Sequence, residues 1–364
     1  MAAVFLLLAS SRDTGSGWGA VAQHLSEALA AEGRVILLTG DEAEPEARRL
    51  TSQQRGRGRL LRLWRDAARV RRVLASEGLD PARVTLLAVD ETVLPLAAFL
   101  NMRHGLRFGL VYHGTYAVDP GTGFDRRAMA LAERRATAIF AVSRFTRDAV
   151  LETRPALAAK IHVANPGVPR RDITPLPRAD RAPVVLSVAA VKPRKGADRL
   201  VEALALIPAA RRPRLEILGL TKPRSTFQRK VMDRIAALGL EDHVTFRGFV
   251  SAAERDQAYA RAMLFALPSQ QSRTGFEGFG LVHLEANQFG TPTIGCLNCG
   301  NEDAITDGET GFLVDPEDTA ALADRIDRLC SDPGLWQRLS EAGHARVQAQ
   351  TYAPMAEVVR RTLS

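Results

Sequence analysis

Two glutamates eight residues apart lie in a segment whose residue types suit the binding of a phosphate. Glu277 and Glu285 belong to the sequence Phe-Glu-Gly-Phe-Gly-Leu-Val-His-Leu-Glu. Its glycines indicate a loop that enters a helix near Gly280, where free backbone N–H groups and a positive dipole end would face an anion. A phosphate flanked by two carboxylates fits a nucleotide sugar, with one carboxylate for the ribose and one for the sugar ring. Two solvated glutamates on a surface helix are the alternative.

A basic turn precedes this segment in the chain. Lys192, Arg194 and Lys195 follow an apolar run over 184–188 that is typical of a buried strand. Cations at the end of that strand would pair with the same phosphate. By itself, a turn of this composition is usually only solvated.

A second glycine-rich turn follows the first apolar run of the chain. Gly15-Ser-Gly17-Trp-Gly19 precedes a helical pattern and is suited to holding an anion on backbone N–H groups. A dinucleotide-binding fingerprint fits poorly, because its third glycine would fall on Ala20. A turn that only reverses the chain is the other interpretation.

The elements that must position these residues alternate between short apolar runs and longer amphipathic stretches. This alternation predicts α/β architecture, with mostly parallel sheets and helices on both faces. Strands are predicted over 4–8, 34–38, 84–89, 108–112, 138–142, 184–188, 215–218, 244–246, 264–266 and 293–295. Helices are predicted over 16–31, 59–75, 197–206, 226–238, 252–261, 281–289 and 319–330.

A proline-rich segment divides the alternating pattern into two halves. Residues 165–183 contain many prolines and interrupt the pattern, as an interdomain linker would. We predict an N-terminal Rossmann-like lobe over 1–170 and a C-terminal one over 171–348, with a cleft between them. Residues 349–364 are predicted to form a helix that packs back on the N-terminal lobe.

Composition and charge exclude several classes of protein. The 364 residues are 46% hydrophobic and 25% charged, which is ordinary for globular domains and excludes disorder. Three cysteines are too few for a disulfide framework, and Cys296 and Cys299 lack the further ligands of a zinc site. The apolar N-terminus has no basic segment before it, so it is predicted to be a strand rather than a signal peptide. We therefore expect a cytoplasmic protein.

The segments described so far resemble retaining glycosyltransferases of the GT-B fold, family four. Glu277 and Glu285 match that family's EX7E motif. Further similarities lie in Asn165-Pro-Gly-Val, Val185-Leu-Ser-Val, Phe246-Arg-Gly-Phe-Val, Gly290-Thr-Pro-Thr-Ile-Gly and Asp307-Gly-Glu-Thr-Gly-Phe-Leu-Val-Asp-Pro. The resemblance covers nearly the whole chain, strongly over 184–325 and more weakly over 40–110. It implies two lobes whose parallel sheets face a central cleft, with the donor bound by the C-terminal lobe and the acceptor by the N-terminal one.

The resemblance implies a role for each matching residue. Glu277 would bind the hydroxyls of the transferred sugar, Glu285 the ribose, and Lys195 the departing diphosphate. His113 would reach the donor sugar from the N-terminal lobe, although a histidine at a strand end is ordinarily structural. The other donor-binding positions are Gly17, Lys192, Arg194, Phe249, Phe279, Gly280 and Leu281.

The implied reaction is transfer of a hexose from a nucleotide-diphosphate sugar, UDP- or GDP-linked, to a hydroxyl acceptor with retention. In this family the leaving phosphate itself accepts the acceptor's proton, and the chain has no Asp-x-Asp metal motif. We expect no metal and no cofactor. A sugar-nucleotide epimerase or a phosphorylase of the same fold stays open, as does an impaired nucleotide-sugar-binding protein. The last is motivated by Ala189-Ala190, which stands where the family commonly has Gly-Arg.

Most of the excess positive charge lies in one stretch of the N-terminal half. The net charge is +8, and residues 48–72 hold ten arginines against Asp66 alone. One interpretation is an amphipathic helix that docks Leu60, Leu63, Trp64 and neighbouring apolar residues on the lobe, with its arginines solvated.

The functional interpretation is contact of Arg55–Arg72 with an anionic acceptor or membrane, peripheral at its inner face. Binding of nucleic acid is not expected, because Trp64 is the only aromatic residue among these arginines. The acceptor-side candidates are Arg59, Arg62, Trp64 and Tyr116.

Overall fold

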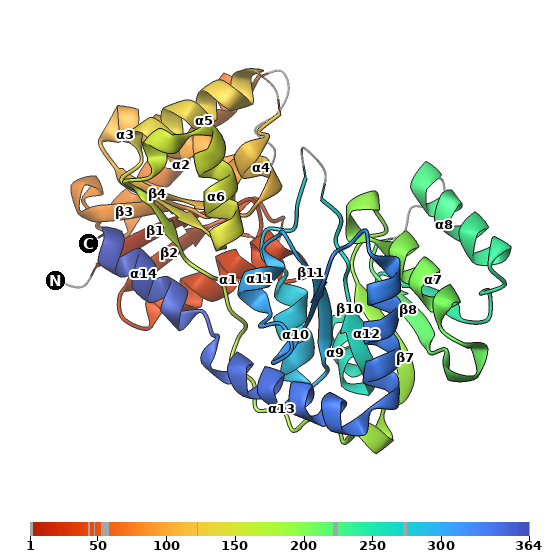
Figure 1. The fold of residues 1–364 in the computed structure, drawn as a ribbon. Coiled ribbons are helices and arrows are strands. Elements are labelled where there is room, and N and C mark those ends of the chain that lie inside the picture. The colour runs from red at the N-terminus through yellow and green to blue at the C-terminus, as the bar shows by residue number, and fades with distance from the viewer. Residues whose placement is uncertain are drawn as a thin grey trace. The chain divides into compact units, whose positions relative to one another are not determined.

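The chain folds into two compact units. The computed structural model describes residues 3–42, 44–46, 48–51, 58–121, 123–220, 225–271 and 275–363. Unit 1 consists of Met1–Pro169 with Tyr352–Ser364, and unit 2 consists of Arg170–Thr351. Figure 1 shows the elements of each unit. The last segment of the chain therefore belongs to the same unit as the first.

Unit 1 is built on a six-stranded parallel sheet. The strands lie in the order β2-β1-β3-β4-β5-β6. Their bounds are β1 (Val4–Leu8), β2 (Arg34–Leu38), β3 (Val84–Ala88), β4 (Arg107–Tyr112), β5 (Ala138–Ala141) and β6 (Ile161–Val163). The central strands are almost continuously apolar because helices cover both of their faces.

More helices cover one face of this sheet than the other. Buried side chains of α2, α3, α5 and α6 form one core with the sheet, and α1 and α14 pack together on the other face (Figure 1). The helices are α1 (Gly17–Ala30), α2 (Arg59–Ser76), α3 (Leu94–His104), α4 (Thr115–Val118), α5 (Gly123–Arg135), α6 (Arg144–Thr153) and α14 (Ala353–Leu363).

The C-terminal helix α14 is fixed to unit 1 by packing and charge. Leu363 lies over Gly109 of β4, where a Cβ atom would be only 2.9 Å from the leucine side chain. The ring of Tyr352 lies 5.4 Å from that of His24 in α1. Arg360 pairs with Glu32 at 2.8 Å. Helix α14 thus completes the face of the sheet that α1 covers only in part.

Unit 2 repeats the architecture with a second six-stranded parallel sheet. Its strands lie in the order β12-β11-β10-β7-β8-β9. Their bounds are β7 (Ala182–Val188), β8 (Arg214–Leu218), β9 (Val244–Gly248), β10 (Ala262–Ala266), β11 (Thr293–Cys296) and β12 (Gly311–Val314). In each unit the strand order reverses near the middle of the sheet, and α/β sheets bind ligands beyond the carboxyl ends of the strands at such a point.

Two separate cores hold the helices of unit 2 on its sheet. One core contains residues of α7, α8, α12 and α13, and the other contains residues of α9 and α10. The helices are α7 (Ala197–Leu206), α8 (Thr226–Ala237), α9 (Ala252–Arg261), α10 (Leu281–Gln288), α11 (Asn301–Ala304), α12 (Thr319–Ser331) and α13 (Pro333–Ala349). Short 3₁₀ helices are η1 (Pro81–Arg83), η2 (Glu91–Val93), η3 (Pro155–Leu157), η4 (Arg178–Asp180), η5 (Pro193–Lys195) and η6 (Ala209–Arg211).

The strands and helices predicted from the sequence are present with ends shifted by one or a few residues. Elements that the pattern did not reveal include the edge strands β6 and β12, which are three and four residues long. An edge strand this short has no periodicity to detect. None of the helices in the described part of the chain is long and apolar enough to cross a membrane.

Candidate functional site

The loop that contains Glu277 ends at the N-terminus of α10. The helix starts after Gly280, which has φ +92° and offers no capping side chain. A Cβ atom at Gly280 would lie 2.3 Å from Asn301 Nδ2, so this position requires glycine for both conformation and space. The amides of Leu281 and Val282 have no partner among the described residues and are available to an anion.

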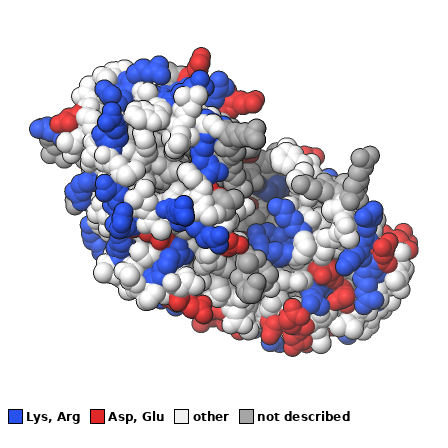
Figure 2. Space-filling model, turned by 90° about the horizontal axis from the view of Figure 1, so that it is seen from above, with Lys and Arg blue, Asp and Glu red and all other residues white. Residues whose placement is uncertain are grey.

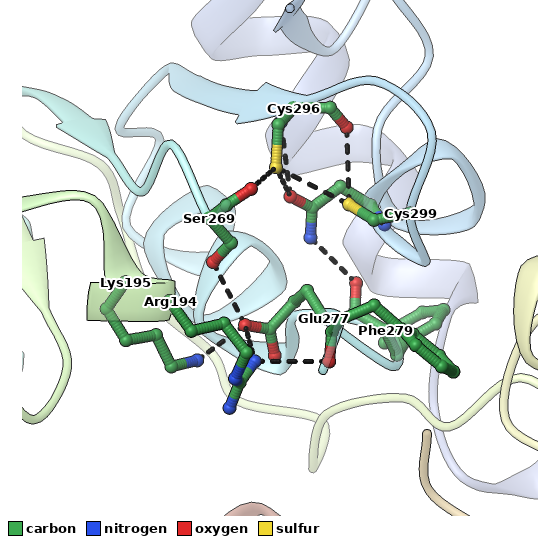
Figure 3. A network of polar contacts seen from close by, with 9 residues as sticks. Arg194, Lys195, Ser269, Glu277, Phe279, Cys296 and Cys299 are labelled. Carbon is green, nitrogen blue, oxygen red and sulfur yellow. Dashed lines mark hydrogen bonds and ion pairs between the residues drawn. The ribbon is translucent and has the colours of Figure 1, made fainter. Parts of the chain in front are cut away.

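One oxygen of Glu277 is the meeting point of three side chains. Lys195 Nζ lies 2.5 Å from Glu277 Oε2, and Arg194 Nη1 and the Ser269 hydroxyl each donate to the same oxygen at 3.0 Å. Figure 3 shows these three side chains converging on the carboxylate. Arg194 also donates to the Phe276 carbonyl at 3.2 Å, which fixes its guanidinium beside the loop.

The charge of Glu277 is held in place by its neighbours. Burial by itself would raise the pKa of Glu277, but the cations Lys195 and Arg194 and the hydrogen bonds from Lys195 and Ser269 outweigh it and lower this pKa to about 2. The carboxylate is therefore ionised at every physiological pH. Because two cations share one carboxylate, the cluster keeps one unneutralised positive charge beside the N-terminus of α10.

The basic turn reaches Glu277 because Gly196 lets it approach the end of β10. A Cβ atom at Gly196, which has φ +68°, would lie 2.0 Å from the Pro268 carbonyl oxygen. The Gln270 amide donates to the Arg194 carbonyl at 2.8 Å and ties the turn to the neighbouring loop. Lys192, by contrast, is exposed and makes no ion pair with any residue that the structure describes.

The turn after β11 supports the Glu277 loop from behind. The Gly300 amide donates to the Glu277 carbonyl at 2.8 Å, and Asn301 Nδ2 donates to the Phe279 carbonyl at 3.1 Å. Cys296 and Cys299 are fully buried with their sulfurs 3.4 Å apart, and the Cys296 thiol donates to the Ser269 carbonyl. Figure 3 shows this turn on the opposite side of Ser269 from the two cations.

Ser269, Asn301 and the supporting role of Cys296 are absent from the residues predicted from the sequence. Ser269 follows β10 and Asn301 begins α11, so each reaches Glu277 or Phe279 only through the parallel sheet. The sequence contains no local signal for these contacts, because the partners are not neighbours in the chain. The cysteine pair contributes packing and hydrogen bonds beneath the loop.

Glu285 lies in the second turn of α10, and its partners differ from those of Glu277. The Tyr259 hydroxyl donates to Glu285 Oε2 at 3.0 Å, and Arg255 Nε lies 3.9 Å from the same oxygen. Both partners belong to α9. The side chain of Glu285 remains 23% exposed, so it can bind a hydroxyl group.

Phe249 is the most exposed large hydrophobic residue among those described. It follows β9 and Gly248, which has φ +69°, and 82% of its surface is exposed. A ring that no neighbour covers is suited to stacking on a planar group. Ala190 lies in the loop after β7, and the second cation at Glu277 comes instead from Arg194.

The first glycine-rich turn of unit 1 is shaped by Gly19 rather than by Gly17. The Ser16 side chain caps α1 by accepting from the Gly19 amide at 3.1 Å. A Cβ atom at Gly19 would lie 2.1 Å from the Asp13 carbonyl oxygen, whereas a Cβ at Gly17 would meet nothing within 4 Å. The space beside Gly17 is open.

His113 is held at the end of β4 by its own unit. Its Nε2 lies 2.6 Å from the Val89 carbonyl and its amide donates to Glu91 Oε1 at 2.8 Å. Burial lowers the pKa of His113, although the bond to Val89 acts in the opposite direction. Burial raises the pKa of Glu91 to about 8, although the hydrogen bond from His113 opposes this. Both side chains are therefore neutral at pH 7.

The four acceptor-side candidates lie in two places within unit 1. Tyr116 lies beside Trp18, with ring centroids 5.3 Å apart. Arg59 of α2 lies over the ring of Phe124 and 3.5 Å from Asp125, and Trp64 packs edge-on against Phe99. Arg62 lies one turn after Arg59. Arg55 and Arg57 fall outside the described residues.

The docked face of α2 is narrower than the sequence pattern predicts. Leu63, Ala67, Val70 and Leu74 are buried as expected. Leu60 and Trp64, which were expected to be docked with them, are 67% and 50% exposed. The prediction was wrong for these two: Phe99 and Arg103 of α3 contact the Trp64 ring but leave half of the side chain exposed, and Leu60 lies at the N-terminal end of the helix.

The raised pKa of Glu91 predicts how the stability of the protein depends on pH. Its carboxyl has a pKa of about 8 when folded against an ordinary value of 4.5, so between these values the unfolded chain ionises it while the folded chain does not. The wild type thus loses stability as pH rises through this window, by about 3 kcal/mol at pH 7. Glu91→Gln lacks this titration and should melt at the same temperature as wild type near pH 4 but higher at pH 8.

Thermal melts from pH 4 to pH 8 would measure the effect. Glu152→Gln, which alters an exposed carboxyl of α6, serves as the control and should follow the wild type throughout. A parallel pH dependence for Glu91→Gln and wild type would show that Glu91 titrates as an ordinary surface carboxyl.

Two family models match the chain in adjacent segments. The model described as Glycosyltransferase Family 4 matches residues 15–171, and the model described as Glycosyl transferases group 1 matches residues 170–346. Together they cover nearly all of the chain, and their boundary falls within a residue of the boundary between units 1 and 2.

Curated relatives match part of the chain. A GDP-mannose-dependent alpha-(1-6)-phosphatidylinositol monomannoside mannosyltransferase of Mycolicibacterium smegmatis is 32% identical over 235 residues, 60% of this chain and 59% of that protein. A D-inositol 3-phosphate glycosyltransferase of Actinosynnema mirum is 33% identical over 205 residues, 52% and 48% of the two chains. The match therefore spans roughly half of the relatives' length.

Solved structures share the fold over almost the entire chain. Sucrose-phosphate synthase from Thermosynechococcus elongatus superimposes with a TM-score of 0.78 at 22% identity, covering 99% of this chain and 98% of that one. Anabaena HepE in complex with UDP and glucose gives a TM-score of 0.77 at 21% identity, covering 99% of both. These likenesses confirm the predicted fold class of two Rossmann-like units with parallel sheets. The chain belongs to the group 1, family 4 glycosyltransferases, which have the GT-B fold.

Proposed function

We propose that this protein is a retaining glycosyltransferase that moves a hexose from a UDP- or GDP-linked sugar to a hydroxyl acceptor without a metal ion. The observation that carries the proposal is the Glu277 cluster. One ionised carboxylate, two cations and the free amides of a helix N-terminus lie together in unit 2. This combination suits a sugar attached to a diphosphate, because hydroxyls need acceptors while phosphates need donors and positive charge.

The diphosphate would be bound by Lys195, Arg194 and the amides of Leu281 and Val282. The surplus positive charge of the cluster favours an anion here, and the dipole of α10 adds to it. Arg194 supplies the second cation that the family commonly places at the position of Ala190. The Ala190 substitution therefore does not leave the diphosphate with a single cation, which argues against an impaired nucleotide-binding protein.

The rest of the donor would extend along residues that are partly or fully exposed. Glu285 would accept hydrogen bonds from the ribose hydroxyls, and Phe249 would stack on the base. GDP-mannose appears in the names of curated relatives, and UDP is bound in the HepE structure. Both are consistent with a nucleotide-diphosphate donor. A screen of donors identifies the base and the sugar.

Glu277 would orient the transferred sugar through its hydroxyls while Lys195 balances the negative charge that forms on the departing diphosphate. The leaving phosphate would accept the proton of the attacking hydroxyl, so that no protein nucleophile is required. His113 would contribute from unit 1. Its Nε2 carries the hydrogen that bonds to Val89, which leaves Nδ1 as an acceptor for a sugar hydroxyl.

Helix α2 supports peripheral contact with an anionic membrane. Leu60, Leu61 and Trp64 are 67%, 56% and 50% exposed at its N-terminal end, and Met102 of α3 is 48% exposed. Exposed arginines follow on the same helix at 65, 71 and 72. Figure 2 shows basic side chains spread over unit 1 in the face it views, with few acidic ones among them. Exposed apolar residues with basic flanks are typical of interfacial helices.

A donor screen tests the proposed function. The protein is incubated in the presence of EDTA with UDP- and GDP-linked glucose, galactose, mannose and N-acetylglucosamine. Each donor is tested with and without a panel of glycoside and cyclitol acceptors, and with and without inorganic phosphate. We expect one donor to yield a product with the anomeric configuration of the donor, detected by NMR. Turnover that requires free phosphate would indicate a phosphorylase, and an epimerised nucleotide sugar without acceptor would indicate an epimerase.

Variants of the cluster separate binding from transfer in the same assay. Glu277→Gln leaves Lys195 and Arg194 without their carboxylate, so it should bind the free nucleotide diphosphate at least as tightly as wild type. Transfer should fall by roughly 10–100-fold, since hydrogen bonds to a charged group contribute about 1.5–3 kcal/mol. Lys195→Ala should weaken nucleotide binding, measured by calorimetry. If Glu277→Gln transferred sugar at the wild-type rate, the assignment of Glu277 to the active site would be wrong.

Two glycine variants of the first turn provide a matched pair. Gly17→Ala adds a methyl group to open space, so the melting temperature should stay within about 2 °C of wild type. The methyl would occupy the place where the backbone meets the donor, and kcat/KM should fall at least about tenfold. Gly19→Ala clashes with Asp13 and should lower the melting temperature. Full transfer by Gly17→Ala would remove Gly17 from the donor site.

Vesicle sedimentation tests the membrane contact. Wild type should bind vesicles that contain phosphatidylglycerol, and binding should weaken with salt. Replacing Leu60, Leu61 and Trp64 with serine should remove most of it, because their apolar surface is exposed. The control replaces Leu206 and Met232, exposed apolar residues of unit 2, with serine. If the triple variant of α2 and the double control variant bind the vesicles equally well, helix α2 is not the membrane contact.

A further inference from the structure

One carboxylate connects the two ends of a short segment of unit 1. The segment, residues 112–118, contains the end of β4, the turn that follows it and α4. The Tyr112 hydroxyl donates to Oε1 of Glu133 in α5 at 2.8 Å. Arg154 donates from Nη1 to the same oxygen and from Nη2 to the Ala117 carbonyl. We call Glu133 and Arg154 the α4 anchor, because together they join the end of β4 to α4.

The bonded ends of the segment are buried, whereas the residues between them reach the surface. Tyr112 and Ala117 are fully buried, and the side chain of Glu133 is only 7% exposed. His113 is partly exposed, and Tyr116 is 44% exposed. The α4 anchor therefore acts from the interior on a segment whose exposed side chains are accessible to other molecules.

Helix α4 does not keep its orientation by its own stability. It has four residues, far fewer than an isolated helix needs. It follows Gly114, whose φ of +124° lies in a region that glycine adopts readily. The packing of Ala117 in the core and its hydrogen bond from Arg154 therefore set where α4 lies. The position of Tyr116, whose ring lies 5.3 Å from that of Trp18, follows from that of the helix.

The helix that carries the carboxylate is itself fixed at its end. Lys160 Nζ donates to the Glu133 carbonyl. It also donates to the carbonyls of Arg134 and Ala136, each at 3.3 Å. A cation is favourable at this end of a helix, where carbonyls lack partners from the next turn. The α4 anchor is therefore built on a part of unit 1 that has little freedom to move.

The chemistry of the α4 anchor suits orientation better than stability. A buried ion pair loses the hydration of both charges, and apolar side chains of similar size often stabilise a fold equally well. Hydrogen bonds, unlike apolar contacts, require a particular direction. Burial and the neighbouring Glu133 carboxylate raise the pKa of Tyr112 well above its usual range, so its hydroxyl stays protonated and donates at physiological pH.

We propose that Glu133 and Arg154 are positioning residues of the transfer reaction, which hold the segment with His113 and Tyr116 in the arrangement that transfer requires. They act through this segment and do not touch the substrates. The assignment rests on the proposed glycosyltransferase function, since it takes His113 to reach the donor sugar and Tyr116 to lie on the acceptor side. Loosening the α4 anchor should slow transfer without weakening the binding of the nucleotide by unit 2.

Two conservative variants loosen the two ends separately. Arg154→Lys keeps a cation beside Glu133, but one ammonium group does not reproduce the two-sided geometry of the guanidinium. Tyr112→Phe removes only a hydroxyl. With the donor and acceptor found in the screen, kcat should fall roughly tenfold or more in Arg154→Lys, since a small displacement of a positioned group slows a reaction strongly. Tyr112→Phe should lose less. Calorimetry with UDP and GDP should give wild-type dissociation constants.

A triple variant separates positioning from stability. Tyr112→Phe, Glu133→Leu and Arg154→Met together replace the network with apolar side chains and leave no buried charge without its partner. We expect this protein to melt near the wild-type temperature but to transfer at least about tenfold more slowly. A purely structural role predicts wild-type kcat in every variant that stays folded. If the triple variant does not fold, the two conservative variants decide.

Hydrogen exchange measured by mass spectrometry tests the α4 anchor without any substrate. Peptides that contain α4 should exchange faster in Arg154→Lys than in wild type, because the helix is held less firmly. Peptides that contain α10 of unit 2 should exchange as in wild type. Arg34→Lys is the matched control, since Arg34 also donates to a carboxylate and a carbonyl, both of Glu77, at the amino edge of the sheet. It should change neither kcat nor the exchange of α4.

The outcomes distinguish this assignment from the proposed function. Wild-type kcat in Arg154→Lys and in a folded triple variant would overturn the positioning role and leave the transferase in place. Unchanged exchange of α4 in Arg154→Lys would also overturn it, because Arg154 would then not hold the helix. A wild type that consumes no nucleotide sugar would reject the proposed function, and this role with it, whatever the exchange shows.

Discussion

The arrangement of unit 2 depends on one carboxylate oxygen, Glu277 Oε2, which receives hydrogen bonds from a lysine, an arginine and a serine. The donors come from two segments: the turn after β7 contributes Lys195 and Arg194, and the loop after β10 contributes Ser269. A largely buried carboxylate with such partners is strongly ionised, and the two cations, which remain partly exposed, keep part of their hydration. The loop before α10 is thereby fixed against the turn after β7 and the loop after β10.

This constraint explains features that are otherwise unrelated. Gly196 and Gly280 both have positive φ angles and close neighbours: a Cβ atom would lie 2.0 Å from the Pro268 carbonyl oxygen at Gly196 and 2.3 Å from Asn301 Nδ2 at Gly280. Asn301 and Gly300 hold carbonyls of the same loop from the turn after β11. The buried cysteine pair completes the packing beneath Ser269, so its CxxC spacing has a structural explanation within the fold.

The strand ends of unit 1 are held together mainly by hydrogen bonds to backbone groups. Its strand ends carry Asp90, Glu91 and His113, and the interactions that hold them are backbone hydrogen bonds rather than ion pairs. The carboxyl edges of the two sheets thus differ in chemistry: unit 2 has two cations on one carboxylate, whereas unit 1 has aromatic rings, His113 and the acidic side chains Asp90 and Glu91. Helix α2 carries six arginines, and one of them, Arg59, pairs with Asp125 of α5.

The sequence by itself determined the fold class, the two-part division and the segments that contain Glu277, Lys195 and Gly280, because strand–helix alternation and glycine turns are local patterns. It also predicted the arginine-rich helix, but it was wrong about the burial of Leu60 and Trp64, because the packing of neighbouring elements decides how much of a helix face is covered. Only the tertiary structure decided that Arg194 shares the oxygen of Lys195, that Ser269 and Asn301 support the loop, and that the His113 amide donates to Glu91. These contacts join residues that parallel strands bring to one edge across long stretches of chain, and no local pattern encodes such pairs.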